Sequence, residues 1–111
     1  MSEHKLQYAI VEYLKLRHIT VLSTDVMSGL AYFSHKDPRR FAYINHQKKM
    51  GYIVGQSDLI ILHKGKAYFA EIKTVKGKQS TEQKEFQALV ESLGHEYLIW
   101  RSLDDVINWV D

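Results

Sequence analysis

The sequence contains no cysteine, one proline and no long hydrophobic run. Without cysteine, the chain has no disulfide framework, no thiolate zinc site and no cysteine nucleophile, and its composition fits a reducing compartment. Even the aliphatic run at residues 59–62 is far shorter than the roughly 20 apolar residues that a membrane span requires. The first five residues lead into no apolar signal-peptide segment. We therefore expect an untargeted cytoplasmic protein that has no membrane partner.

Histidine pairs and glycine-rich loops are also missing. The closest two of the six histidines are 11 residues apart, which excludes a pair of zinc ligands on one helical face. The six glycines are dispersed, and they form neither a phosphate-binding loop nor the G-x-S-x-G elbow of acyl-transfer enzymes. The sequence therefore predicts no nucleotide cofactor.

The length and composition are those of one small globular domain. The chain has 111 residues, of which 45% are apolar and 25% are charged, close to the average for globular proteins. This length leaves room for one hydrophobic core but not for two. We expect a single domain over residues 1–111.

Basic residues concentrate in the middle of the chain. Residues 36–84 hold 11 Lys or Arg against four acidic residues, a net charge of +7, whereas the rest of the chain carries −5. A basic centre is typical of proteins that bind the phosphate backbone of nucleic acids, because neutralising phosphates releases counterions. The alternative is a lysine-rich surface that only keeps the protein soluble.

Hydrophobic periodicity and turn signals predict helices that alternate with strands. Apolar residues at helical spacing follow Ser2, a predicted N-cap, and a basic helix is predicted with Pro38 at N1 and Gly51 at C′. Ser80 and Gln83 match a capping box that begins another helix. The predicted helices are residues 3–17, 39–50, 81–93 and 103–109, and the predicted strands are residues 19–22, 57–63, 66–74 and 96–100. This order predicts an α/β fold, a compact mixed sheet flanked by helices.

A β-hairpin is predicted in the centre of the chain. Two β-rich runs, residues 57–63 and 66–74, are separated only by Lys64 and Gly65, a pair that suits a two-residue turn. The alternative is a three-residue loop with Gly65 in the left-handed conformation, which would shift the pairing by one position.

The two-residue turn would bring two carboxylates together. In its register Asp58 lies directly opposite Glu71, whereas the three-residue loop would set Asp58 opposite Ala70. Directly opposed Cβ atoms are about 4.5 to 5.5 Å apart, where like charges destabilise a sheet unless a cation or a proton intervenes. Strand alternation places Lys73 on the same face as Glu71.

Carboxylate oxygens together with phosphate and water suit Mg²⁺ or Mn²⁺ rather than zinc. The interpretation without a metal is an exposed ion pair of Glu71 and Lys73, worth under about 1 kcal/mol.

Three short motifs follow one another in the second half of the chain. They are Gly55-Gln56-Ser57-Asp58-Leu59-Ile60-Ile61, then Glu71-Ile72-Lys73, then Ser80-Thr81-Glu82-Gln83-Lys84-Glu85-Phe86 with Leu93-Gly94. In this order and spacing they resemble the VRR-NUC family, the virus-type replication-repair nucleases of the PD-(D/E)XK superfamily. The resemblance covers residues 51–100 and, more loosely, the first helix and strand. Ser57 stands where the superfamily name has proline.

The resemblance implies a restriction-endonuclease-like core and metal-dependent hydrolysis of DNA phosphodiester bonds, with one or two Mg²⁺ or Mn²⁺ ions. Asp58, Glu71 and the Ile72 carbonyl would hold the metal, while Lys73 would orient or help deprotonate the attacking water and stabilise the developing charge. The family typically leaves a 5′-phosphate and a 3′-hydroxyl. Stand-alone relatives resemble homodimeric Holliday-junction resolvases, so the resemblance also implies branched DNA, a homodimer and a phage origin, with the host cytoplasm as the location.

Two further parts of the resemblance leave alternatives open. Gln83 matches the glutamine that supports the active site in the family, but as the third residue of a capping box it needs no catalytic role. The first helix contributes an acid in many relatives. Here Glu3 could reach the metal or act only as a first-turn dipole partner, Gln7 stands roughly where relatives have glutamate, and Glu12 points towards solvent.

Basic side chains of the central segment are the predicted DNA contacts, with an ordinary charged surface as the alternative. A chain of this length has no room for a separate sequence-reading domain, so we expect backbone contacts and structure-selective binding. Exposed aromatic residues could form a dimer face or belong to the core. The predicted contacts are Arg39, Arg40, His46, Lys48, Lys49, Lys76 and Lys78, and the aromatic residues are Tyr32, Phe33, Tyr43 and Trp109.

The sequence thus predicts a metal-dependent, structure-selective DNA endonuclease that acts on branched DNA such as Holliday junctions. One alternative is a non-cleaving nucleic-acid-binding module of the same fold, which the set of Asp58, Glu71 and Lys73 disfavours. Another is a protein-interaction factor from a mobile element, which the basic centre disfavours.

Overall fold

The computed structural model describes residues 1–25, 30 and 33–111, and Tyr32 therefore lies outside the described residues. Helices and strands alternate in the predicted order. Within the described residues the elements are α1 (Glu3–Leu16), β1 (Thr20–Ser23), α2 (Arg39–Lys49), β2 (Leu59–His63), β3 (Lys66–Ile72), α3 (Thr81–Ser92), β4 (Glu96–Trp100) and α4 (Leu103–Val110). The predicted element types are confirmed, and the hairpin strands are shorter than predicted at the ends remote from the turn.

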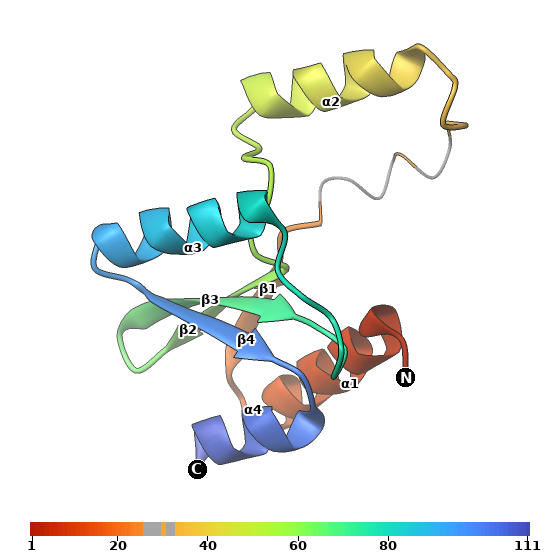
Figure 1. The fold of residues 1–111 in the computed structure, drawn as a ribbon. Helices are drawn as coiled ribbons and strands as arrows, with labels where there is room; N and C mark the ends of the chain where they lie inside the picture. Colours follow the sequence, from red (N-terminus) through yellow and green to blue (C-terminus); the bar gives the residue numbers. More distant parts are fainter. Residues whose placement is uncertain (26–29, 31–32) are drawn as a thin grey trace.

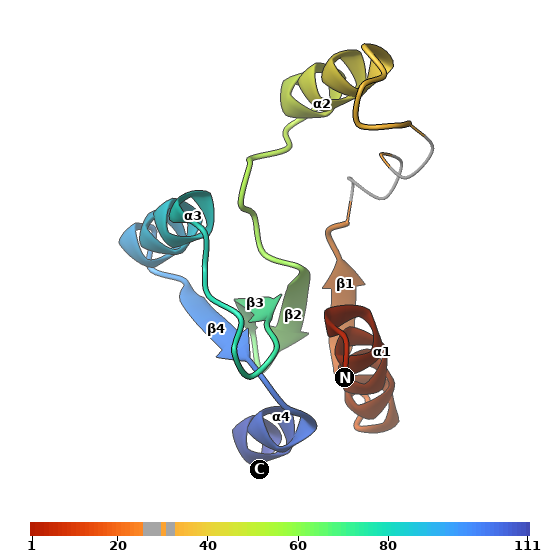
Figure 2. The same ribbon diagram turned by 45° about the vertical axis from the view of Figure 1, so that its right-hand side comes forward.

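The sheet has four strands in the order β1-β2-β3-β4. The pairs β1–β2 and β2–β3 are antiparallel, whereas β4 runs parallel to β3. Helix α3 makes the crossover from β3 to β4. Helices α1 and α4 cover one face of the sheet and α3 covers the other, while α2 stands apart from the sheet (Figures 1 and 2). The predicted class, a mixed sheet flanked by helices, is confirmed. No helix of the described residues is both long and apolar enough to cross a membrane.

A two-residue turn joins β2 to β3. Lys64 and Gly65 both have positive φ, 52° and 77°, as a type I′ turn requires. His63 pairs with Lys66, and the ladder continues to Leu59 opposite Ala70. This is the register that the two-residue turn predicts, and the alternative three-residue loop is excluded.

Side-chain caps fix the starts of three helices. The Ser2 hydroxyl accepts a hydrogen bond from the Lys5 amide at 3.2 Å, and both α3 and α4 begin with complete capping boxes. Helix α2 departs slightly from the prediction. Pro38 is the N-cap residue rather than N1. The Asp37 carboxylate accepts a hydrogen bond from the Arg39 amide at 2.9 Å.

The main hydrophobic core lies between the sheet and the pair α1 and α4. Its centre consists of Ile10, Leu14, Leu59, Ile61 and Val106, all fully buried. Aromatic contacts extend it at the α4 end, where the Trp109 ring lies against Trp100, Tyr68 and His63 with ring centroids 5.0 to 5.6 Å apart. Trp109 is therefore a core residue. Phe33, in contrast, packs on Tyr43 of α2.

Gly55 is the closest approach between the segment before β2 and the first turn of α3. A Cβ atom at this position would lie 2.4 Å from the Glu82 carbonyl carbon and 2.7 Å from the Gln83 amide nitrogen. Its φ of +87° also favours glycine. The contact fixes the segment that carries Asp58 against α3.

We predict that Gly55→Ala lowers the free energy of unfolding by at least about 3 kcal/mol, because backbone overlap adds to the strain of the left-handed conformation. Gly65→Ala is the matched control. Gly65 also has positive φ but has open space around its Cβ position, so this variant should lose only about 1 to 2 kcal/mol. Denaturant unfolding measures both losses, and equal losses would contradict the close approach.

Candidate active site

Two acidic residues meet at the end of the hairpin remote from its turn. Continuing the register of β2 and β3 by one position sets Asp58 opposite Glu71. The Asp58 carboxylate accepts a hydrogen bond from the Ile72 amide at 2.7 Å, which holds it against the end of β3. Glu71 is only 1% exposed. Two carboxylates therefore share one place in a largely dehydrated part of the protein.

The two oxygens of Glu71 differ in their partners. Oε1 accepts a hydrogen bond from the Tyr97 hydroxyl at 3.0 Å, whereas Oε2 is buried and has no hydrogen-bond partner among the described residues. A buried acceptor without a partner is costly and unusual in proteins. An ion that bound Oε2 would supply the missing partner.

Burial and mutual repulsion favour the protonated forms of these acids. Burial raises the pKa of Asp58, the charges of Glu3 and Asp25 add to this, and the Ile72 amide and Lys73 oppose it. Burial likewise raises the pKa of Glu71, assisted by the charges of Asp58 and Glu3, while the Tyr97 hydrogen bond and Lys73 lower it. A pair of carboxylates with raised pKa values in one place is typical of sites that bind a cation or move a proton.

Lys73 follows β3 and reaches the same place. It is 9% exposed, and its amide donates to the Trp100 carbonyl at 3.0 Å, which extends the pairing of β3 with β4 by one residue. Its positive charge lowers the pKa of both Asp58 and Glu71. Asp58, Glu71 and Lys73 thus form one electrostatic unit, which we call the acid–lysine cluster.

A cavity of about 170 Å³ opens beside the cluster at the start of α1. Glu3 and Gln7 of α1 border it together with Asp58 and Ile72. Glu12 lines a different hollow at the far end of α1. Of the predicted candidates on the first helix, Glu3 and Gln7 therefore border the site and Glu12 does not.

Asp25 also lines this cavity and was not predicted from the sequence. It follows β1. The neighbouring Thr24 donates two hydrogen bonds, from its hydroxyl to the Ser57 carbonyl and from its amide to the Asp58 carbonyl, and these bring Asp25 beside Asp58. The sequence signal for Asp25 was an acid two residues after a strand, and that strand pairs with β2, which begins directly after Asp58.

The donor set fits a hard divalent cation. Two carboxylates and the Ile72 backbone supply oxygen atoms, which Mg²⁺ and Mn²⁺ prefer, and no described residue gives Glu71 Oε2 another partner. In the part of the chain that the structure describes, no three His, Asp or Glu side chains converge closely enough to form a ready-made metal cluster. The protein thus provides a partial set of ligands, and water or substrate oxygen would complete it.

Comparison with solved structures finds a protein described as a VRR_NUC domain protein. It matches with a TM-score of 0.65 at 22% sequence identity, over 99% of this chain and 85% of its own length. No family model and no curated protein matches the sequence. The chain has a VRR_NUC fold. The resemblance predicted from the sequence is confirmed for the fold, and the structural likeness covers 99% of the chain, beyond residues 51–100 and the first helix and strand.

Within the VRR_NUC fold, Gln83 serves the capping box. Gln83 Oε1 accepts a hydrogen bond from the Ser80 backbone amide at 2.8 Å. The backbone amide of Gln83 donates to the Ser80 hydroxyl at 3.1 Å. A different glutamine approaches the cluster: the Gln79 side chain lies close enough to the Tyr97 hydroxyl to lower the pKa of Tyr97. A supporting role for Gln83 in catalysis stays a prediction.

The predicted DNA contacts fall into two groups. Arg39 and Arg40 have partners within the protein: Arg39 pairs with Asp37 at 2.6 Å, and Arg40 donates to the Leu30 and Phe33 carbonyls. The other members are exposed, on the last turns of α2 (His46, Lys48 and Lys49) and on the loop that follows Lys73 (Lys76 and Lys78).

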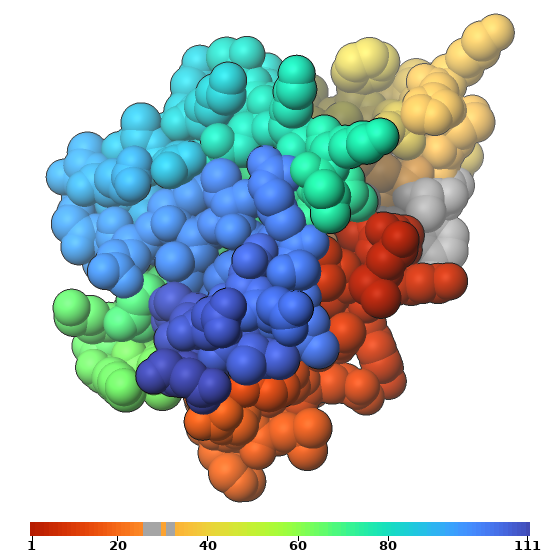
Figure 3. Space-filling view, turned by 60° about the horizontal axis from the view of Figure 1, so that its bottom comes forward, coloured from red at the N-terminus to blue at the C-terminus, as the bar shows by residue number. Residues whose placement is uncertain are grey.

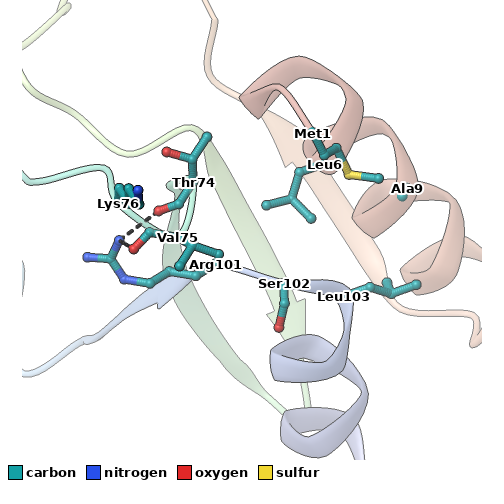
Figure 4. Close-up of a pocket in the computed structure, with 9 residues that line it drawn as sticks. All are labelled: Met1, Leu6, Ala9, Thr74, Val75, Lys76, Arg101, Ser102 and Leu103. Carbon is teal, nitrogen blue, oxygen red and sulfur yellow. Dashed lines mark hydrogen bonds between the residues drawn. The ribbon is translucent and has the colours of Figure 1, made fainter.

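Arg101 organises that loop in the VRR_NUC fold and was not predicted. Its Nη1 donates to the carbonyls of Thr74 at 2.8 Å, Val75 at 3.4 Å and Gly77 at 2.6 Å. The first two bonds appear in Figure 4, beside a cavity of about 580 Å³ between the start of α1, this loop and the start of α4. The space-filling view shows the start of α1 lying against the same loop (Figure 3). Arg101 thereby fixes the loop that carries Lys76.

We predict that Glu71→Gln stabilises the metal-free protein at neutral pH. Because the folded state raises the pKa of Glu71, the favourable contribution of the protonated acid is present at low pH and is lost as the pH rises through that value. With EDTA present, the variant should melt a few degrees above wild type at pH 7, and the gap should shrink towards pH 4.

The control for this comparison is Glu91→Gln, which neutralises an exposed acid on α3. It should leave the melting temperature within about a degree of wild type across the same range. A gap for Glu71→Gln that stays constant with pH would contradict a destabilised buried carboxylate.

Proposed function

We propose that the protein is a metal-dependent DNA endonuclease that hydrolyses phosphodiester bonds. The observation that carries this proposal is the acid–lysine cluster with its buried, unpartnered Glu71 Oε2. The nuclease-type fold supports it, because the VRR_NUC neighbour matches nearly the whole chain.

Asp58, Glu71 and the Ile72 carbonyl would hold Mg²⁺ or Mn²⁺, with Glu3 at the mouth of the cavity as an outer contact. When bound, such an ion polarises a phosphoryl oxygen and makes a water more acidic. The Lys73 ammonium orients the attacking water and stabilises the negative charge that develops on the phosphate oxygens. The Ile72 amide keeps Asp58 in place through its hydrogen bond.

The exposed basic residues support a DNA substrate. Lys76 and Lys78 lie on the loop that begins directly after Lys73, and the α2 group stands away from the sheet (Figure 1). Both groups suit phosphate contacts along an extended backbone rather than a pocket for a mononucleotide. Contacts to the phosphate backbone respond to the shape of DNA rather than to its base sequence, so we include branched DNA and a homodimer in the proposal.

A non-cleaving nucleic-acid-binding module is the second candidate. The absence, among the described residues, of a third acidic side chain that completes the cluster favours it. The same basic residues would serve both functions, so only a cleavage assay separates them.

The decisive experiment incubates the purified protein with labelled four-way junction, flap and linear duplex DNA in Mg²⁺, Mn²⁺ or EDTA. We expect metal-dependent cleavage with preference for the branched substrates, reduced at least about a hundredfold in Glu71→Ala. Glu91→Ala, an exposed acid on α3, is the control and should cleave like wild type. Binding without cleavage in every metal would favour the second candidate, and no DNA binding would contradict both.

We also predict the salt dependence of DNA binding. Replacing both Lys76 and Lys78 by alanine should weaken binding to all DNA shapes and reduce the slope of log K against log salt by roughly 2, because two phosphate contacts are lost. The control pair, Lys15→Ala with Lys66→Ala, removes the same charge at the opposite end of the domain. Fluorescence anisotropy at several salt concentrations measures both slopes, and equal reductions would indicate a general effect of charge.

A further inference from the structure

Tyr97 of β4 reaches one oxygen of Glu71 from the neighbouring strand. In the parallel ladder Tyr97 lies opposite Phe69, two residues before Glu71 and on the same face of the sheet. The length of the phenol spans this offset, and its hydroxyl donates to Glu71 Oε1 at 3.0 Å.

The Tyr97 ring is held in place by the helix that covers this face. It lies against Phe86 of α3 with ring centroids 6.3 Å apart, and Phe86 also contacts Phe69 at 6.1 Å. Aromatic packing of this kind leaves the ring few other orientations. The position of the hydroxyl is therefore set by the docking of α3 on the sheet.

A second side chain lies near the hydroxyl. Gln79 is close enough to lower the pKa of Tyr97, and its Nε2 donates to Gln87 Oε1 at 3.0 Å. Gln87 belongs to α3, so this helix also fixes the polar neighbour of Tyr97.

The hydrogen bond makes the two Glu71 oxygens inequivalent. Rotation of the carboxylate would break the contact with Tyr97, so Oε1 stays bound and Oε2 is the oxygen that no described residue contacts through a hydrogen bond. Outer contacts of this kind fix the orientation of metal-binding carboxylates.

We propose that Tyr97 is a positioning residue that fixes the Glu71 carboxylate so that Oε2 is presented to the divalent cation. This inference rests on the proposed function, because it assigns Tyr97 a role at that same site. Tyr97 acts through Glu71 and touches neither DNA nor the reacting phosphate.

The test is the affinity for Mn²⁺ of the full-length Tyr97→Phe protein, which loses only the hydroxyl and keeps the ring against Phe86. Titration calorimetry should show Mn²⁺ binding weakened about 10- to 100-fold. The control, Tyr68→Phe, removes a hydroxyl on the opposite face of the sheet beside Trp109 and should bind Mn²⁺ like wild type.

Cleavage kinetics provide a second readout that a merely structural role would not move. In Tyr97→Phe, kcat at low Mn²⁺ should fall while KM for DNA stays unchanged, and raising the Mn²⁺ concentration should restore kcat. If Tyr97→Phe does not fold, Gln79→Leu removes the polar neighbour of the Tyr97 hydroxyl and should also weaken Mn²⁺ binding.

The outcomes distinguish this inference from the proposed function. If wild type binds Mn²⁺ and cleaves DNA, but Tyr97→Phe binds Mn²⁺ within about twofold of wild type, the role of Tyr97 is overturned and the proposed function stands. If wild type binds no divalent cation, the metal-dependent function fails and the inference fails with it.

Discussion

The register between β2 and β3 determines whether the acid–lysine cluster can form at all in this fold. Lys64 and Gly65 both adopt left-handed conformations in the turn, and this geometry leaves one pairing for the strands that follow. A slip of one residue would move every side chain of one strand to the other face of the sheet. Asp58 and Glu71 would then lie on opposite faces, and the shared carboxylate site would be lost. The turn lies at the end of the hairpin remote from Asp58 and Glu71. The left-handed conformations of its two residues therefore set the pairing along the whole length of both strands.

The acid–lysine cluster is locally unfavourable for the metal-free protein. Burial raises the pKa of both carboxylates, and one oxygen of Glu71 finds no hydrogen-bond partner in the described parts of the chain. The surrounding structure supplies the compensation: a core of aliphatic residues on one face of the sheet and an aromatic layer beneath α3 on the other. Such a division between a stabilising scaffold and a strained site is typical of functional centres.

The sequence was sufficient for the features that depend on local chemistry. Capping residues, turn residues and hydrophobic periodicity predicted the order of the elements and the hairpin, and from the hairpin followed the meeting of Asp58 with Glu71. The loop residue Asp25 could not be predicted in the same way, because its place depends on tertiary hydrogen bonds made by Thr24. Tyr97 was missed because the register of a parallel strand is set by the crossover helix and not by a turn. The spacing from Ser80 predicted Gln83 as the capping glutamine, which the structure confirms, but no sequence signal placed Gln79 beside Tyr97.

The parallel pairing of β4 with β3 has a consequence for the order in which the site is assembled. Asp58, Glu71 and Lys73 are close in sequence. Tyr97, which contacts Glu71, belongs to β4, and Arg101, which contacts the loop after Lys73, is the residue that follows β4. As the chain emerges from the ribosome, the hairpin can form well before these contacts are available. The carboxylates are therefore held in their final arrangement only after α3 has crossed the sheet and β4 has docked. A nascent chain would carry the acidic residues of the site before it carried an ordered site.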